Sequence, residues 1–113
     1  MRIAMFTNNY KPYIGGVPVS IEHLAEALRR RGHTVYIFAP TYEDQVEEPY
    51  VIRYPSFPIK VAGAPVPNVL TGIFIKKVRE LNIDVIHVHH PAIVGNVALS
   101  IRKKLGVPAM SLS

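Results

Sequence analysis

The stretch MRIAMFTNNYKPYIGGVPVSIEHLAEALRRRGHTVYIFAP, residues 1–40, decides the fold. An apolar run, Arg2–Thr7, leads into a loop that ends at Gly15-Gly16, and apolar residues then recur at helical spacing over Val17–Arg31 before a second apolar run, Val35–Ala39. This order predicts a βαβ unit with a glycine-bearing turn at the carboxyl end of its first strand. Ligands bind at that edge of open α/β sheets, because the backbone N–H groups of the turn and of the helix N-terminus point there. A site for a phosphate-bearing ligand is therefore expected.

The rest of the chain continues the alternation of strands and helices. The expected elements are strands Tyr50–Tyr54, Val85–Val88 and Val107–Leu112 and helices Val69–Leu81 and Ile93–Leu105. The segment Pro55–Pro67 holds four prolines and is expected to be a loop. We predict one domain over residues 1–113, of the α/β class: a Rossmann-like open parallel sheet in the order 3-2-1-4-5 with helices on both faces. Nothing follows the last strand to cover it, so we expect the chain to be the front part of a larger protein.

The composition is that of an ordinary globular domain with a basic excess. Of 113 residues, 49% are hydrophobic and 19% charged, the formal net charge is +5, and cysteine is absent. The lack of thiols excludes a disulfide framework and cysteine nucleophiles. Together with the lack of a signal-peptide core or a membrane-length apolar run, it predicts a cytoplasmic protein. Peripheral contact with the inner membrane face, through apolar and basic residues around Lys60, stays open.

The basic residues cluster at the ends of the predicted helices. They are Arg29-Arg30-Arg31, Lys76-Lys77 with Arg79, and Arg102-Lys103-Lys104. Cations there complement the negative end of the helix dipole. The same ends lie opposite the expected ligand edge. Helix capping is therefore favoured over a membrane surface or an acidic partner, and nucleic acid is not an expected partner.

Gly15 and Gly16 are the first candidates for ligand contact. Glycine lets the backbone approach a diphosphate closely, although a plain tight turn before a helix explains the pair equally well. A dinucleotide fingerprint needs G-x-G-x-x-G directly after the first strand, and residues 7–12 contain no glycine. A Walker G-K-[ST] sequence is also missing. The spacing therefore disfavours a nicotinamide-dependent oxidoreductase and a P-loop nucleotidase.

The second candidate is the run His87-Val88-His89-His90-Pro91 at the end of a predicted strand. The period of two places His87 and His89 on one face of the sheet. Imidazole both donates and accepts, which suits a substrate hydroxyl or phosphate, and hydrogen-bonded structural histidines are an equal alternative. A zinc site is the third interpretation, but the chain has no cysteine and His33 falls at the opposite edge, so no metal is expected.

The polar turn Asn8-Asn9-Tyr10 lies beside the glycines. Amides and a phenol suit hydroxyl recognition, and Asn is also common in turns for conformational reasons alone. Glu22 and Glu26 are expected to be solvated rather than catalytic. The same holds for the charged loop that carries Glu43, Asp44, Glu47 and Glu48.

Four parts of the chain carry a resemblance to a known family. They are residues 1–17, residues 24–40 with LAEALRRRGH and VYIFAP, the segment IRYPSFP at 52–58, and DVIHVHHP at 84–91. These segments resemble the N-terminal, acceptor-side domain of the retaining glycosyltransferases of family 4, which have the two-domain GT-B fold. The resemblance covers nearly the whole chain, and it is greatest to members that glycosylate lipids such as diacylglycerol.

The resemblance implies transfer of a sugar from a nucleotide-sugar donor to a lipid or saccharide acceptor, with no cofactor and no obligatory metal. It places Gly15 and Gly16 at the donor diphosphate. It places His87, His89, His90 and Pro91 in the cleft, with the neighbouring Asn8, Asn9 and Tyr10. Many members carry Asp where this chain has Asn8, and an amide cannot act as a base. Most donor contacts of the family lie in a C-terminal domain, so we expect this chain to be inactive without such a domain in cis or in trans.

Three hypotheses of different class remain, and the sequence assigns no catalytic residue. The first is the acceptor-side domain of a glycosyltransferase of the hexosyltransferase type. The second is a non-catalytic binding or assembly module of the same fold, which would form a homo-oligomer through its uncovered last strand. The third is another Rossmann-like enzyme that holds a metal through His87 and His89. The resemblance favours the first.

Overall fold

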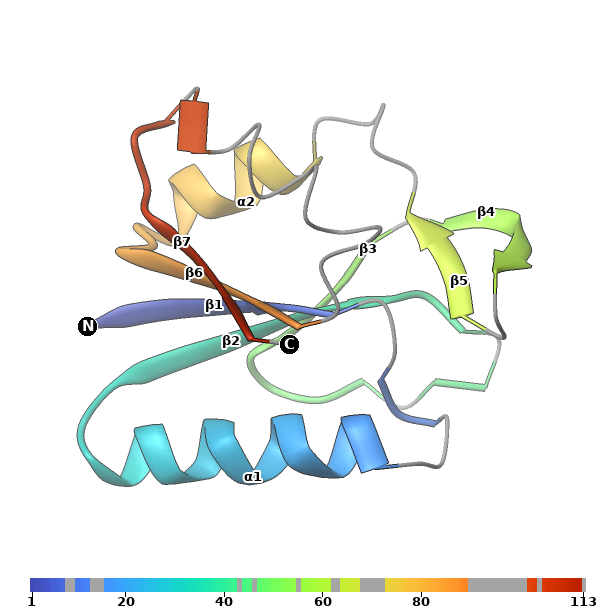
Figure 1. Cartoon of the computed structure of the whole chain (residues 1–113), viewed down its shortest axis with the longest axis horizontal. Coiled ribbons are helices and arrows are strands. Elements are labelled where there is room, and N and C mark those ends of the chain that lie inside the picture. The colour runs from blue at the N-terminus through green and yellow to red at the C-terminus, as the bar shows by residue number, and fades with distance from the viewer. Residues whose placement is uncertain are drawn as a thin grey trace.

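A five-stranded parallel sheet forms the centre of the molecule (Figure 1). The computed structural model describes residues 1–7, 10–12, 16–42, 44–45, 47–54, 56–61, 64–67, 73–89, 102–103 and 105–112. The strands are β1 (Arg2–Phe6), β2 (Thr34–Pro40), β3 (Val51–Tyr54), β6 (Val85–His89) and β7 (Ala109–Leu112). Every neighbouring pair is parallel, in the order β3-β2-β1-β6-β7. These are the five strands expected from the sequence, and the predicted order 3-2-1-4-5 is confirmed.

Helices cover both faces of the sheet, as predicted. Helix α1 (Gly16–Arg30) lies on one face and α2 (Ile73–Glu80) on the other (Figure 1). Residues 102–103 and 105, just before β7, are also helical. The predicted helices at 69–81 and 93–105 are thus confirmed in part, because residues 68–72 and 93–101 lie outside the described residues.

The alternation of side chains along the strands divides the core into two clusters. On the α1 face, Ile21 and Ala25 of the helix pack against Met5 and Ile37 of the sheet. On the α2 face, Val78 packs in a cluster built on aromatic side chains; its ring residues are Phe6, Phe38 and Tyr54. The rings of Phe6 and Phe38 stack with their centroids 4.7 Å apart. The apolar stripe expected on the first helix is therefore the face that packs on the sheet.

Both described helices end in the same way. At the end of α1 the His33 amide donates to Leu28 O (3.2 Å) and Gly32 has a positive φ of 93°. At the end of α2 the Ile83 amide donates to Val78 O (3.3 Å), with Asn82 in the positive-φ position. This is the Schellman pattern, which satisfies carbonyls that the helix leaves without partners. The basic residues in the last turns of α1 and α2 therefore lie at helix ends, as predicted.

One sequence prediction was wrong. The segment expected to be a loop, Pro55–Pro67, forms a separate antiparallel hairpin of β4 (Ser56–Val61) and β5 (Ala64–Pro67). Prolines are excluded from central strands because they lack an N–H donor, but each strand of a two-stranded sheet has a free edge. The register also shifts between Phe57 and Lys60, and Pro58 lies within that irregularity. A bulge leaves a residue outside the ladder, which accommodates a proline.

Candidate functional site

The carboxyl edge of the sheet gathers the ends of β1, β2, β3 and β6 next to the start of α1. The first helical residue, Gly16, is exposed there, and a Cβ built on it would meet nothing within 4 Å. Gly16 itself therefore places no side chain beside the first helical backbone groups, and the N-terminus of a helix suits an anion. Its partner in the prediction, Gly15, lies outside the described residues.

The two described histidines of the HVHHP run share one face of the sheet, as the strand period predicts. The rings of His87 and His89 lie 4.8 Å apart, centroid to centroid, while Ile86 and Val88 point into the core on the opposite face. Burial lowers the pKa of His87, because a charged imidazole is poorly solvated there. A neutral imidazole can donate and accept a hydrogen bond at once. His90 and Pro91 lie outside the described residues, as do Asn8 and Asn9.

Lys11 ties the turn after β1 to two other segments. Its ammonium donates to Glu22 of α1 and to Glu48 Oε1 (2.6 Å) of the β2–β3 connection. Burial lowers the pKa of Lys11, but the two carboxylates outweigh it and the net effect is a raised pKa. The sequence did not predict these ion pairs. The side chains of Glu22 and Glu48 are still 43% and 31% exposed, and the expectation that they are solvated rather than catalytic stays a prediction. No sequence signal marks the cluster, since the partners are 11 and 37 residues from Lys11 along the chain.

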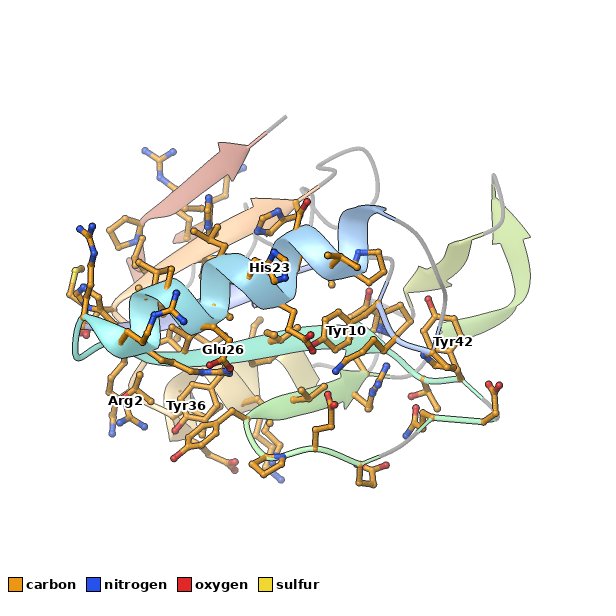
Figure 2. The ribbon with its side chains drawn as sticks, turned by 90° about the horizontal axis from the view of Figure 1, so that it is seen from below. Arg2, Tyr10, His23, Glu26, Tyr36 and Tyr42 are labelled. Atoms are coloured by element: carbon orange, nitrogen blue, oxygen red, sulfur yellow. The ribbon has the colours of Figure 1, made fainter. Side chains whose placement is uncertain are left out.

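Two tyrosine rings lie within cation–π distance of Arg53 at the end of β3. The Arg53 guanidinium carbon lies 5.5 Å from the centroid of the Tyr10 ring and 5.9 Å from that of Tyr42, and its Nη1 donates to Pro40 O (3.0 Å). Figure 2 shows Tyr10 and Tyr42 near each other at this end of the sheet. Cation–π contacts of this kind hold the guanidinium in place. The side chain of Tyr10 is only 1% exposed and belongs to the α1-face core. Its predicted contact with an acceptor is not tested by this geometry.

The opposite face of the same edge is closed by hydrogen bonds. The buried Tyr54 hydroxyl donates to Thr7 O (2.6 Å), and the Thr41 hydroxyl and amide both donate to Tyr54 O (2.9 and 3.1 Å). These bonds join the ends of three strands.

Two further properties follow from the part of the chain that the structure describes. In it, no group of three or more His, Asp or Glu side chains is arranged to hold a metal ion. The expectation that the site needs no metal is not tested by this. Within the same residues, no helix has the length and apolar character needed to cross a membrane.

The family model described as Glycosyltransferase Family 4 matches residues 14–111. The chain belongs to this family. It is 33% identical over 114 residues to an alpha-monoglucosyldiacylglycerol synthase of Acholeplasma laidlawii, an alignment that covers 97% of this chain and 29% of the relative. It is also 33% identical over 121 residues to a GDP-mannose-dependent alpha-mannosyltransferase of Mycobacterium tuberculosis, covering 99% and 32%.

A solved structure confirms the fold. Sucrose-phosphate synthase from Thermosynechococcus elongatus superposes with a TM-score of 0.67 over 97% of this chain and 32% of that one, at 18% identity. The chain thus has the fold of the N-terminal domain of a GT-B glycosyltransferase, as the sequence predicted. It spans about a third of the length of the family-4 relatives named above.

Proposed function

We propose that this domain forms the acceptor-side wall of the cleft of a retaining glycosyltransferase, which moves a sugar from a nucleotide-sugar donor to a lipid or saccharide acceptor. The observation that supports this most directly is the exposed Gly16 at the N-terminus of α1, at the carboxyl edge of the sheet, in a chain of family 4. Helix N–H groups at Gly16 face the position where the donor diphosphate would gain charge as the glycosidic bond breaks. Gly15 extends this contact in the proposal.

The acceptor is held, in this proposal, by the polar groups around the same edge. His87 is kept neutral by burial, so it can accept the proton of an acceptor hydroxyl in a hydrogen bond and donate another. Asn8, Asn9, Tyr10, His89, His90 and Pro91 complete the proposed acceptor contacts. Of these, Asn8 is an amide and cannot serve as a base. We infer no cofactor and no obligatory metal.

The remaining donor contacts come from a second domain, in cis or in trans. Retaining transfer requires that both reactants are positioned and that the leaving diphosphate is stabilised, and one wall of a cleft does neither alone. We propose that the 113-residue chain by itself is inactive. The glycolipid synthase and the mannosyltransferases among its relatives leave lipid and saccharide acceptors as the two classes to compare. A lipid acceptor would bring the protein to the cytoplasmic membrane surface.

A chimera tests the proposal. This chain replaces the matched N-terminal segment of the Mycobacterium tuberculosis mannosyltransferase, whose remaining part is kept, and transfer of labelled mannose from GDP-mannose is measured. We expect transfer by the chimera to diacylglycerol vesicles or to soluble oligosaccharides and none by the 113-residue chain. A folded chimera that binds GDP-mannose but transfers to neither acceptor, beside a stable homo-oligomer of the chain, would point to a non-catalytic assembly module instead.

Gly16→Ala and Ser20→Ala are the matched pair within that chimera. Each variant has an alanine methyl group at an exposed position of α1. A Cβ on Gly16 meets no atom within 4 Å, so neither variant should disturb the fold. We expect Gly16→Ala to lower kcat/KM for the donor by about tenfold, equivalent to about 1.4 kcal/mol, because the methyl group keeps the diphosphate from the helix amides. Equal activities of the two variants would remove Gly16 from the donor site.

A further inference from the structure

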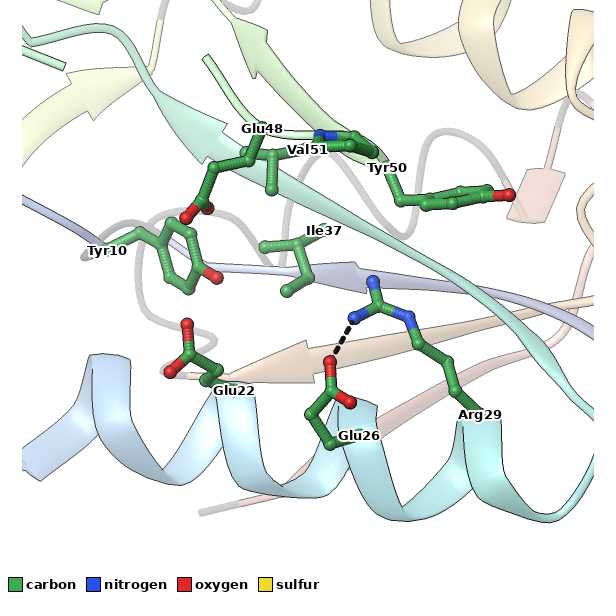
Figure 3. A pocket seen from close by; sticks show the side chains of 9 residues that line it. Tyr10, Glu22, Glu26, Arg29, Ile37, Glu48, Tyr50 and Val51 are labelled. Carbon is green, nitrogen blue, oxygen red and sulfur yellow. Dashed lines mark hydrogen bonds and ion pairs between the residues drawn. The ribbon is translucent and has the colours of Figure 1, made fainter. Parts of the chain in front are cut away.

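A cavity of about 390 Å³ lies beside α1, under the β2–β3 connection (Figure 3). Tyr10 and Glu22 line it near the carboxyl edge, and it extends along the helix past Glu26 to Arg29. Ile37 of β2 and the β2–β3 connection form its other walls. Its volume falls in the range of about 300–1,000 Å³ that small-molecule sites occupy. The cavity runs away from the carboxyl edge, on the flank of the sheet.

The hydroxyl group of Tyr10 points into this cavity (Figure 3). The side chain is 1% exposed, yet among the described residues its only hydrogen bond is that of its backbone amide to Tyr42 Oη (3.4 Å). Burial raises the pKa of Tyr10, so the phenol keeps its proton and remains a donor. Among the described residues, the Tyr10 hydroxyl is not one of the buried side-chain atoms that lack a partner, and the cavity opens to solvent. A ligand hydroxyl that enters the cavity would take the place of water at this donor.

Each of the three carboxylates at the cavity has a cationic partner, and Glu22 and Glu48 share one, Lys11. Lys11 bonds both Glu22 and Glu48, and Arg29 Nη1 lies 3.0 Å from Glu26 Oε1. An ammonium ligand would have to displace these cations, and a phosphate would face three carboxylates. Each carboxylate can accept up to about four hydrogen bonds, so its ion pair leaves acceptor positions open. The lining therefore offers hydrogen-bond acceptors and donors to a neutral ligand.

An aromatic ring stands at the rim. Tyr50 lines the cavity, is 51% exposed and has a positive φ of 65°, a conformation that is rare for a residue with a bulky side chain. Its ring lies 5.4 Å from that of Tyr36 and 5.6 Å from the Arg29 guanidinium carbon. Strained backbone of this kind is found at ligand clamps. An exposed ring presents an apolar face to the C–H groups of a sugar, with its hydroxyl still in water.

We propose that this cavity is a binding site for a neutral, hydroxyl-rich small ligand, a monosaccharide or an acyclic polyol. The Tyr10 hydroxyl donates to one ligand hydroxyl, the carboxylates of Glu22, Glu26 and Glu48 accept from others, and Tyr50 covers one face of the ligand. The cavity shares Tyr10 with the proposed acceptor contacts but extends from there along the flank of the sheet. The site goes beyond the proposed transfer function, because it needs neither a nucleotide sugar nor a second domain.

A titration of the full chain tests this. Backbone amide spectra of the ¹⁵N-labelled protein are recorded with glucose, mannose or sorbitol, and separately with inorganic phosphate and with choline. We expect saturable shifts for the sugars or the polyol at Tyr10, Glu22 and Tyr50, and none at this cluster for phosphate or choline. If no neutral ligand shifts these amides up to its solubility limit, or if choline or phosphate alone does so, the proposal is wrong.

Three variants locate the bound ligand. Tyr10→Phe removes one oxygen atom and should weaken sugar binding about tenfold, the effect of losing about 1.4 kcal/mol. Glu26→Gln keeps the shape of a cavity wall and should also weaken binding, since an amide nitrogen replaces one acceptor. Tyr54→Phe, the same change on the opposite face of the sheet, should leave it unaltered. Sugar shifts that survive in both Tyr10→Phe and Glu26→Gln would place the ligand elsewhere and overturn the proposal. Because no transfer is measured, this result is independent of the GDP-mannose chimera.

Discussion

The two faces of the sheet are built on the same strands but are completed differently. The helix on each face ends with a Schellman turn. Each face also has a tyrosine near the carboxyl edge that is 1% exposed, Tyr10 on the α1 face and Tyr54 on the α2 face. On the α2 face the Tyr54 hydroxyl donates to Thr7 O, and the core is closed by stacked rings. On the α1 face the Tyr10 hydroxyl adjoins a cavity. The comparison teaches that two equally buried tyrosines differ in whether the hydroxyl bonds to the backbone or faces a cavity.

The connection between β2 and β3 causes this difference. Its described residues, 41–42, 44–45 and 47–50, form turns and irregular backbone where a crossover helix would cover the sheet. Among the described residues, α1 therefore covers β2 on that side, and Val51 of β3 packs against the same cluster. Lys11 forms ion pairs with both Glu48 of this connection and Glu22 of α1, and so links the two segments. The cavity is what remains between the helix and the connection.

Truncation of adjacent residues on β2 should give the largest difference between the faces. Phe38 and Ile37 are each 1% exposed but point to opposite faces. We expect Phe38→Ala to lower the free energy of unfolding by about 3–5 kcal/mol, because a closed core cannot fill the void. Ile37→Ala should cost about 2 kcal/mol, at the low end for its type, because it enlarges a cavity that already opens to solvent. Urea denaturation followed by circular dichroism measures both.

A third variant controls for the helix itself. Ile21→Ala removes a fully buried side chain of α1 that does not line the cavity. Its cost should exceed that of Ile37→Ala. If Ile37→Ala proved as costly as Phe38→Ala, the α1 face would be as tightly closed as the other and the comparison would fail.

The second largest difference is expected between the stability costs of replacing the two buried tyrosines by phenylalanine. Tyr54→Phe removes the donor of a buried hydrogen bond and should destabilise the fold by about 1–2 kcal/mol. Tyr10→Phe removes a hydroxyl that has no described partner, so its stability should stay within about 0.5 kcal/mol of the wild type or rise slightly. Thermal denaturation of the ligand-free protein checks this. A loss of more than 1 kcal/mol in Tyr10→Phe would show that the hydroxyl is already satisfied.

Sequence analysis predicted the fold because the fold depends on local periodicity. The alternation of apolar runs and helical patterns was enough to predict five strands and their order. The hairpin was missed because proline argues against a strand unless one edge is known to be unpaired. The Lys11 cluster was missed because only the folded chain brings its members together. Of the proposed donor and acceptor residues, the shared face of His87 and His89 was predictable, since it follows from the strand period alone.

Glycine substitutions should show that the end of α1 and the end of the helical residues before β7 are equivalent. Gly32 follows α1 and Gly106 precedes β7, with φ of 93° and 71°, and a Cβ on either would meet no atom within 4 Å. Gly32→Ala and Gly106→Ala should each cost about 1 kcal/mol from backbone strain alone. Gly16→Ala, which has equal space but helical backbone, is the control and should cost nothing. Differential scanning calorimetry of the three variants measures this; costs that differ widely between Gly32→Ala and Gly106→Ala would mean that the two helix ends are not equivalent.

The smallest effect should come from His87, on the α1 face. Because burial lowers the pKa of this imidazole, the unfolded chain binds more protons than the folded one between the folded pKa and about 6.5, the ordinary value. The stability that its neutral form contributes is therefore complete above about pH 6.5 and is lost as the pH falls through that window. Urea midpoints of His87→Gln should depend less on pH over this range than those of the wild type. His23→Gln, on an exposed turn of α1, reports the effect of losing an imidazole from the surface. An unchanged pH dependence in His87→Gln would mean that folding does not lower the pKa of His87, and burial would then not be what keeps this imidazole neutral.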